Sequence, residues 1–445
     1  MKTLSLALLI LTCSLSADEW TIELLDSEGC TGYWSSIHMD SADQTHIVYR
    51  DDTANQLIHV FQNGTGWTSE VIATCDCWFI SMVLDSSDKP HVSYWDNSTS
   101  EISYANWDGS CWVISVLETA GTSAYEYPRS DIELDSAGLP HVTWYDGIEG
   151  RLKYGSWTGS DWNIITVDSI GITGVDPSLS LDSNDNPHIS YCNRTDSCLK
   201  YAFYNGSEWQ QQTVDASGDV GGCTSIFLDG NDNPRISYYS WNPYESVKYA
   251  LKDGSNWTIE VVYQTPHTYP GTPQGLTLDS QGNAHISASY SDYQNFLIYF
   301  QKGITGWTHE FVDGDYTGWD SSICTDTSDI PHIAYFDIYN EDLLYAKKDA
   351  SGTFEEYSCP LQSFAFSIYP NPAYGASFVS ITTNSFLSLE LSVFDLSGRA
   401  IIPAMQIEVT ASSNSTVLDG LVPGIYFCQV SDGNALSSQR FVILE

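Results

Sequence analysis

Aromatic residues, carboxylates and arginines occur together in the segments that join the predicted strands of this chain. The rings offer flat apolar faces, and the charged groups offer directional hydrogen bonds. This combination suits sugars, whose C–H faces stack on rings while their hydroxyls donate and accept hydrogen bonds. The candidate ligand-binding residues are Trp34, Arg50, Asp51, Trp78, Trp95, Asp96, Arg129, Asp146, Arg194, Trp241, Trp319 and Asp337.

Two other classes of function use the same residue types. Arginines near these segments could form the cluster that binds a substrate carboxylate, although no spacing selects a set; they are Arg50, Arg129, Arg151 and Arg194. Glycoside hydrolysis needs two carboxyl groups about 5 or about 6.5–9.5 Å apart, a distance that a sequence does not supply. We therefore predict carbohydrate binding, with a glycoside hydrolase, a polysaccharide lyase or a protein-binding adhesin as alternatives. No catalytic residue is identified.

A histidine recurs at a fixed place, which could suggest a metal site or acid–base chemistry. Its copies are His46, His91, His141, His188, His285 and His332, and Arg235 stands in the remaining place. Because one active site needs such a group only once, we expect a structural role in which the histidine bonds to a neighbouring turn. The aspartate-rich turns lack the distal glutamate of an EF-hand loop. No metal or cofactor is predicted.

The stretch that contains this histidine is an internal repeat. Residues 181–191 read Leu-Asp-Ser-Asn-Asp-Asn-Pro-His-Ile-Ser-Tyr, and related copies begin at residues 39, 84, 134, 228, 278 and 325. The spacing of about 47 residues is typical of solenoids and propellers. Each repeat alternates short strand-like runs with glycine, proline and asparagine turns, four runs per repeat. The sequence therefore predicts an all-β, seven-bladed propeller of four-stranded blades over residues 18–359.

An aromatic residue opens the fourth strand of every repeat and is expected to pack on a neighbouring blade. The series is Trp67, Trp112, Trp162, Trp209, Trp257, Trp307 and Phe354. Trp20 lies 47 residues before Trp67, in the same register. The segment 20–25 could therefore close the ring by joining the blade built from the other end, with residues 354–357 displaced or pairing beside it. The sequence leaves this closure open.

Glycine turns precede four of these tryptophans, at Gly109, Gly159, Gly206 and Gly254. These Gly-x-x-Trp turns resemble part of the Asp-box of sialidase-like propellers, and they lie between the third and fourth strands as that box does. The aspartate expected two residues before the glycine is absent, since Trp107, Trp157, Tyr204 and Lys252 stand there. The resemblance is to a degenerate form of the box. It implies the propeller architecture.

After residue 360 the repeat stops and a different unit begins. It opens with Tyr-Pro-Asn-Pro at 369–372, continues through Asp-Leu-Ser-Gly-Arg at 395–399, and contains Leu-Val-Pro-Gly-Ile-Tyr-Phe at 421–427. Alternating runs between turns predict a small immunoglobulin-like β-sandwich over 366–445 after a linker at 360–365. The motifs resemble the type A C-terminal sorting domain of type IX secretion. The resemblance implies export by that machinery across an outer membrane, cleavage near 359–366, and a secreted or cell-surface location.

The net charge and the N-terminal segment limit the partners and the location that the sequence predicts. The formal net charge of −41 would repel nucleic acid and anionic membranes, so we predict neither as a partner. Residues 1–17 have the lysine, short apolar run and small residues of a secretory signal peptide. No integral membrane segment is expected. Export permits disulfides, and the one pairing suggested by a short hairpin loop joins Cys192 to Cys198.

Overall fold

The computed structural model describes residues 20–348 except 65, 123–125, 243–244, 265–268, 292–294, 305 and 315. It also describes residues 364–444 except 370–372, 375–376, 384–386, 396–398, 410–413, 419–420, 423 and 432–435. The predicted signal peptide and most of the predicted linker lie outside these residues. The chain divides into two compact units, Met1–Ala350 and Ser351–Glu445, which are described separately.

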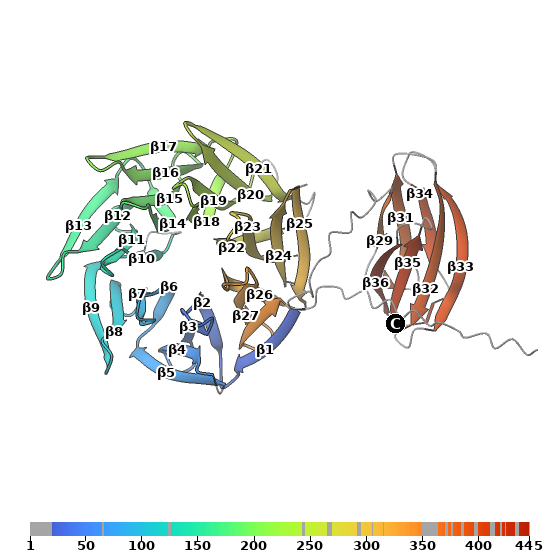
Figure 1. Cartoon of the computed structure of the whole chain (residues 1–445), viewed down its shortest axis with the longest axis horizontal. Helices are drawn as coiled ribbons and strands as arrows, with labels where there is room; N and C mark the ends of the chain where they lie inside the picture. The colour runs from blue at the N-terminus through green and yellow to red at the C-terminus, as the bar shows by residue number, and fades with distance from the viewer. Residues whose placement is uncertain are drawn as a thin grey trace, which may run out of the picture. The chain divides into compact units, whose positions relative to one another are not determined.

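The first unit is a ring of seven antiparallel sheets, each of four strands (Figure 1). From the centre outward, the first blade comprises β2 (Thr31–Met39), β3 (Thr45–Asp51), β4 (Gln56–Gln62) and β5 (Trp67–Thr74). The second comprises β6 (Cys77–Leu84), β7 (Pro90–Asp96), β8 (Glu101–Trp107) and β9 (Trp112–Thr119). The third comprises β10 (Ser130–Leu134), β11 (Pro140–Asp146), β12 (Arg151–Trp157) and β13 (Trp162–Asp168).

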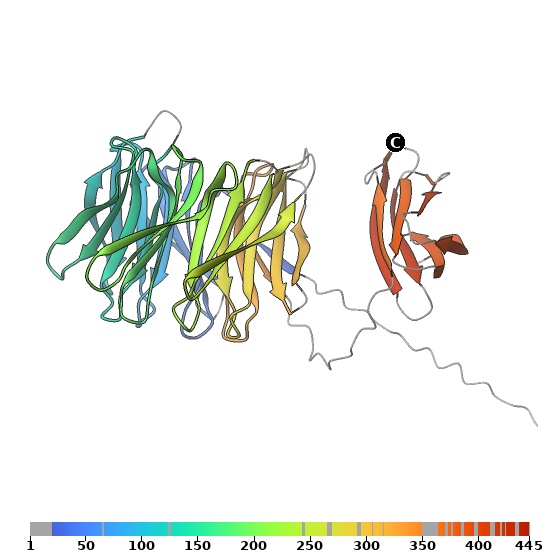
Figure 2. The same cartoon turned by 90° about the horizontal axis from the view of Figure 1, so that it is seen from above.

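The remaining blades repeat this order. The fourth comprises β14 (Thr173–Leu181), β15 (Pro187–Asn193), β16 (Cys198–Tyr204) and β17 (Trp209–Asp215). The fifth comprises β18 (Val220–Leu228), β19 (Pro234–Ser240), β20 (Ser246–Asp253) and β21 (Asn256–Gln264). The sixth comprises β22 (Tyr269–Leu278), β23 (Ala284–Ser291), β24 (Asn295–Gly303) and β25 (Gly306–Asp313). The predicted seven-bladed propeller is confirmed, and Figure 2 shows its strands running between the two faces of the ring.

The seventh blade shows how the ring is closed. It contains β26 (Thr317–Thr325), β27 (Pro331–Asp337) and β28 (Asp342–Lys348), and its outermost strand is β1 (Trp20–Asp26) from the other end of the propeller. Trp20 pairs with Lys348, and Leu24 pairs with Leu344. The ring is thus closed by hydrogen bonds between distant parts of the chain, which leaves no gap between the first and last blades. Residues 354–357 lie outside the described residues.

The recurring stretch makes the turn and second strand of each blade. In the fourth blade, Asp182 accepts hydrogen bonds from the backbone N–H groups of Asn184 and Asn186 at 2.9 and 2.8 Å. The Nδ1 atom of His188 lies 2.5 Å from the Tyr201 hydroxyl, and its Nε2 atom lies 3.7 Å from Asp182. The histidine therefore links the turn to the third strand, which confirms its expected structural role. Arg235 replaces it by bonding to Asp229.

The repeated tryptophans join each blade to the one before it. Trp162 meets Tyr104 edge-on with ring centroids 5.5 Å apart, and Trp209 meets Tyr154 at 5.3 Å. Trp20 makes the same contact with Tyr299 at 5.2 Å, in register with the others. Edge-to-face packing of this kind adds about 0.5–1.5 kcal/mol to the area buried by each ring. The expected structural role of the tryptophans is confirmed.

The second unit contains two sheets. One comprises β29 (Phe364–Tyr369), β31 (Ser377–Thr383) and β34 (Asn414–Leu418); the other comprises β30 (Ala373–Tyr374), β36 (Leu436–Leu444), β35 (Gly424–Ser431), β32 (Leu387–Asp395) and β33 (Ala400–Val409). Leu418 of the first sheet shares an apolar core with Leu391 and Val430 of the second. Two sheets around one core form a sandwich. Its first strand begins slightly before the predicted boundary at residue 366.

The predicted disulfide between Cys192 and Cys198 is wrong. Both thiols are free and buried. In the register of β15 and β16, Cys192 stands opposite Leu199, and Cys198 stands opposite Asn193. Side chains alternate between the faces of a strand, so the two cysteines point to opposite faces of the hairpin. The short loop between them suggested proximity, but the register separates their sulfur atoms.

Candidate binding site at the mouth of the central channel

The innermost strand of several blades carries a bulge at the same place. The residues there adopt a left-handed backbone, with φ of 49° at Trp34, 53° at Phe79 and 49° at Asp176, Cys223 and Asp320. Bulky residues rarely occupy this region, and such backbone strain occurs preferentially at functional sites. Each of these residues precedes the first residue of the recurring stretch by five positions, as does Arg129 in the third blade. We call these six residues the channel mouth.

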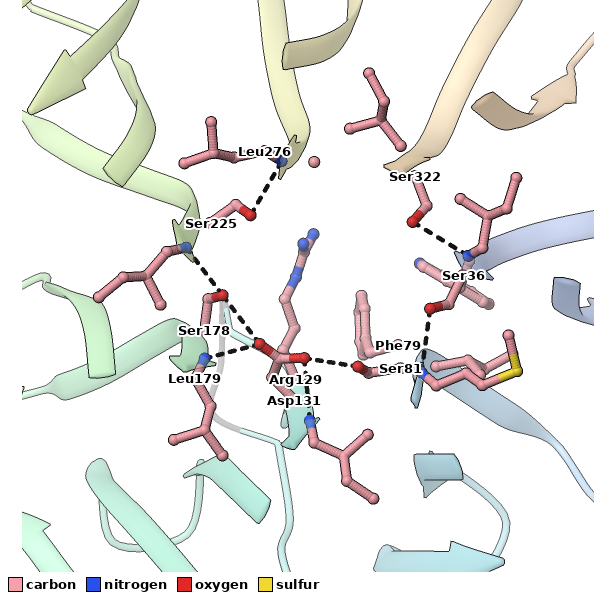
Figure 3. A pocket seen from close by; sticks show the side chains of 18 of the residues that line it. Ser36, Phe79, Ser81, Arg129, Asp131, Ser178, Leu179, Ser225, Leu276 and Ser322 are labelled. Atoms are coloured by element: carbon pink, nitrogen blue, oxygen red, sulfur yellow. Dashed lines mark hydrogen bonds between the residues drawn. The ribbon is translucent and has the colours of Figure 1, made fainter. Parts of the chain in front are cut away.

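A second ring lies two residues further along the same strands, shown end-on in Figure 3. We call it the serine ring; it comprises Ser36, Ser81, Asp131, Ser178, Ser225, Gly275 and Ser322. A serine oxygen accepts a hydrogen bond from a backbone N–H of the next blade, as from Met82 to Ser36 at 3.1 Å and from Ile226 to Ser178 at 3.1 Å. The ring therefore ties neighbouring inner strands together around the channel.

Asp131 replaces serine in the third blade and makes more bonds than the residue it replaces. Its carboxylate accepts hydrogen bonds from the hydroxyls of Ser81 at 2.6 Å and Ser178 at 2.9 Å. It also accepts from the backbone N–H groups of Leu179 at 2.7 Å and Ile132 at 3.0 Å. Burial raises the pKa of this carboxyl, and the four donors oppose that shift. Asp131 thus connects three successive blades (Figure 3).

Two further titratable groups, His38 and Glu133, lie two residues beyond the serine ring on the inner strands. Burial, and secondarily the charge of Asp131, raise the pKa of Glu133 to about 8. Burial lowers the pKa of His38 to about 4. Glu133 therefore carries its proton and His38 lacks one at neutral pH, so both are uncharged there.

The rings surround a cavity of about 260 Å³, which is lined by residues from all seven inner strands. Within the part of the chain that the structure describes, Arg129 is the only arginine or lysine in this lining. Four acidic residues share the lining with it: Asp131, Glu133, Asp176 and Asp320. The cavity is therefore polar, and carboxyl groups outnumber cations in it.

Arg129 is held within the mouth by a carboxylate and an aromatic ring. Its Nε atom lies 2.9 Å from Oδ1 of Asp176, and its guanidinium carbon lies 4.7 Å from the centre of the Phe79 ring. Burial alone would lower the pKa of Arg129, but Asp176 raises it above the ordinary value. The other oxygen of Asp176 accepts a hydrogen bond from the backbone N–H of Cys223 at 2.8 Å. The guanidinium is thus charged, and its charge is paired.

Asp320 completes the mouth on the opposite side of the channel. One of its oxygens accepts a hydrogen bond from the backbone N–H of Trp34 at 3.3 Å. Burial raises the pKa of this carboxyl, while Arg129 acts in the opposite direction. Asp176 and Asp320 make the same kind of bond to the following blade, so aspartate side chains hold the strained backbone at Cys223 and Trp34.

An aromatic cluster extends from the mouth over the first three blades. The rings of Trp34 and Trp78 are stacked, with centroids 4.6 Å apart and planes 22° apart. Tyr127 continues the cluster 5.4 Å from Trp78. The guanidinium of Arg50 lies 5.7 Å from Trp34 and 5.6 Å from Trp78, and it forms an ion pair with Asp76. These rings form an aromatic platform beside the cavity.

A second arginine–aromatic contact lies on the side of the fourth and fifth blades. Nε of Arg194 donates to Glu126 at 2.6 Å, and its guanidinium carbon lies 4.5 Å from the centre of the Trp241 ring. Trp241 covers the backbone of Gly222 so closely that a Cβ atom there would lie 1.8 Å from the ring. Only glycine allows this approach. Arg50, Arg129 and Arg194 therefore share one arrangement: each contacts an aromatic ring and pairs with a carboxylate.

The structure divides the residues predicted from the sequence into two groups. The mouth and its surroundings bring together Trp34, Arg50, Trp78, Arg129, Arg194 and Trp241, and Trp319 stands beside Asp320 with 46 % of its surface exposed. Trp95 is buried and donates its indole N–H to the carbonyl of Ala120. Asp51, Asp96, Asp146 and Asp337 cap hairpin loops by accepting backbone N–H bonds. These five side chains bond within the propeller, and ligand binding by them stays a prediction.

Sequence reasoning missed Phe79, Asp176, Cys223, Asp320 and Glu126. The first four could have been found, because they share the offset of five residues before the recurring stretch. The residue type at this repeated position varies from blade to blade, which indicates that the fold does not require one particular side chain there. Glu126 lies in a segment without a repeat pattern, so no spacing pointed to it.

The C-terminal unit has a family match. Residues 367–444 match the model of the secretion system C-terminal sorting domain. The chain carries a type IX sorting domain. The sequence motifs that resembled this domain are confirmed, and the protein is exported by type IX secretion to the cell surface or the surrounding medium. Among the described residues, no helix is long and apolar enough to cross a membrane.

The propeller resembles solved structures at low sequence identity. A polysaccharide lyase described as an ulvan lyase shares 12 % identity with a TM-score of 0.53, over 73 % of this chain and 96 % of that one. A fungal alcohol oxidase shares 11 % identity with a TM-score of 0.52, over 96 % and 100 % of the two chains. An Aleuria aurantia lectin shares 17 % with a TM-score of 0.44, over 65 % and 96 %. No curated protein sequence matches the chain. The likeness to the lyase and the oxidase shows the fold alone.

Proposed function

We propose that the propeller binds carbohydrate outside the cell, in the manner of a lectin, at the channel mouth. The observation that carries this proposal is the set of three arginine–carboxylate pairs, each against an aromatic ring, of which one lines the polar cavity and two lie beside the mouth. The glycan is the external partner of the propeller, and the secretion machinery is the partner of the sorting domain. No cofactor is invoked.

The chemistry of the mouth supports this proposal in two ways. The stacked rings of Trp34 and Trp78 offer an apolar face to the C–H side of a sugar. Paired arginine and aspartate groups, as in Arg129 and Asp176, place donors and acceptors side by side, which suits neighbouring hydroxyls. Because the groups are held by the fold before any ligand arrives, little conformational entropy is lost on binding.

The alternatives drawn from the sequence receive less support. A sialidase-like enzyme would need arginines free to bind a substrate carboxylate, whereas Arg50, Arg129 and Arg194 already pair with acidic side chains. A protein-binding adhesin would be favoured by a broad exposed apolar patch. The candidate site is instead a recessed polar cavity with an aromatic platform at one side.

The proposal is tested by applying the purified full-length protein to a glycan array and measuring affinities for the best ligands. Phe79→Ala removes the ring on which Arg129 rests, and we expect an affinity loss of about tenfold, the equivalent of about 1.4 kcal/mol. Phe311→Ala is the matched control, since this residue lies on outer strand β25 with 54 % of its surface exposed. Absence of binding to every glycan, or equal affinity of the two variants, would refute the proposal.

A further inference from the structure

We propose that the channel mouth selects uncharged ends of glycan chains, that is, terminal sugar residues without a carboxylate or sulfate group. This inference rests on the proposed function and narrows its ligand class. It follows from the charge balance of the site and from the way in which the blades enclose it.

The charge balance disfavours an anionic ligand. At the level of the mouth, the single cation Arg129 lies beside Asp176, and Asp320 faces the same cavity. Asp131 lies one level deeper, with its four hydrogen-bond donors supplied by the protein. An acidic group on the bound sugar would therefore enter among carboxylates, and like charges brought together out of water repel strongly.

The other arginines near the mouth do not reverse this balance. Arg50 is buried and is paired with both Asp52 and Asp76, and Arg194 is paired with Glu126. The mouth and its surroundings thus contain three arginines and five carboxylates, which are Asp52, Asp76, Glu126, Asp176 and Asp320. Neutral hydroxyls can bond to a paired guanidinium and carboxylate without separating them. An anion would have to displace a carboxylate that is already in place.

Enclosure explains why the ligand is a chain end. Inner strands of all seven blades surround the cavity, so it is bounded on every side of its axis (Figure 3). Its volume of about 260 Å³ is below the range of about 300–1,000 Å³ typical of pockets for larger ligands. One sugar ring fits this space, and a polymer reaches it by its terminus. The platform formed by Trp34 and Trp78 lies where the next sugar units would leave the mouth.

The first experiment uses the full-length protein on an array of paired oligosaccharides. Each neutral oligosaccharide stands beside the same molecule capped at its non-reducing end by a uronic acid, a sialic acid or a sulfate. We expect binding to neutral members and a loss of about tenfold or more on capping. Equal or tighter binding to capped members overturns the inference while leaving carbohydrate binding intact. Absence of binding to both members refutes the proposed function itself.

The second experiment changes the charge balance without removing the arginines. Asp176→Asn keeps an oxygen for the Cys223 N–H but leaves the charge of Arg129 unpaired, and Glu126→Gln does the same for Arg194. Both variants should reduce the discrimination against acid-capped oligosaccharides by about tenfold, measured by calorimetry. Glu149→Gln is the control, because it releases the exposed Arg151, paired at 2.9 Å, outside the cavity lining. Unchanged discrimination in folded Asp176→Asn and Glu126→Gln proteins overturns the inference.

Discussion

Asp131 offers the sharpest test of how the ring is held together. Four donors from three blades converge on this one carboxylate, whereas serine occupies the equivalent place in five blades. Two substitutions separate the contributions. Asp131→Ala removes every acceptor, and Asp131→Ser installs the side chain that the other blades use.

The expected magnitudes follow from the bonds that each variant leaves unmade. In Asp131→Ala, the N–H group of Leu179 loses its acceptor, while Ser81 is free to accept from Ile132. An unsatisfied buried amide costs about 1–3 kcal/mol. The free energy of unfolding should therefore fall by about 1–3 kcal/mol. In Asp131→Ser, the hydroxyl can accept from Leu179 as Ser36 does from Met82, and Ser81 is free to accept from Ile132. The loss should then be about 1 kcal/mol or less.

Urea unfolding followed by tryptophan fluorescence measures both values. All 15 tryptophans lie between residues 20 and 319, so the signal reports on the propeller and not on the sorting domain. We expect the order wild type, Asp131→Ser, Asp131→Ala in decreasing stability. If Asp131→Ala is as stable as the wild type, or if the serine variant loses as much as the alanine variant, the proposed role of the ring is refuted.

Three further expectations concern the propeller. In the folded protein Glu133 has a pKa of about 8, so it keeps a proton that the unfolded chain releases near the ordinary pKa of about 4.3. The free energy of unfolding should therefore fall as the pH rises from about 4.3 to about 8, by at most about 1.4 kcal/mol per pH unit. Glu133→Gln should flatten this slope, measured by urea unfolding at a series of pH values. Gly174→Ala, at φ +90° with a Cβ 2.5 Å from Leu152 Cα, should lower the melting temperature well below that of Gly159→Ala, at φ +92° with open space around it; equal melting temperatures would contradict the close approach. The wild type and Cys192→Ser should each melt at the same temperature with and without reductant, because Cys192 and Cys198 are free thiols. A wild-type melting temperature that falls on adding reductant, with no such fall in Cys192→Ser, would show that Cys192 does form a disulfide.

The sequence by itself determined the repeating part of this protein. The spacing of about 47 residues set the number of blades, and the positions of His188 and Trp162 within the repeat indicated structural roles. These predictions succeeded because a blade is built from local hairpins, and neighbouring residues determine both the turns and the alternation of apolar and polar side chains along each strand. The sorting domain was likewise recognisable from short motifs in a fixed order.

The tertiary structure decided which distant residues meet. Closure of the ring brings Trp20 to Lys348, and the inner bulge of the fourth blade places Asp176 against Arg129 of the third. The pairing of Arg194 with Glu126 spans 68 residues, and no local pattern encodes it. Strand register, and not loop length, separates Cys192 from its expected partner. The site depends on the angle and depth at which seven blades meet, and those quantities exist only once the ring has closed.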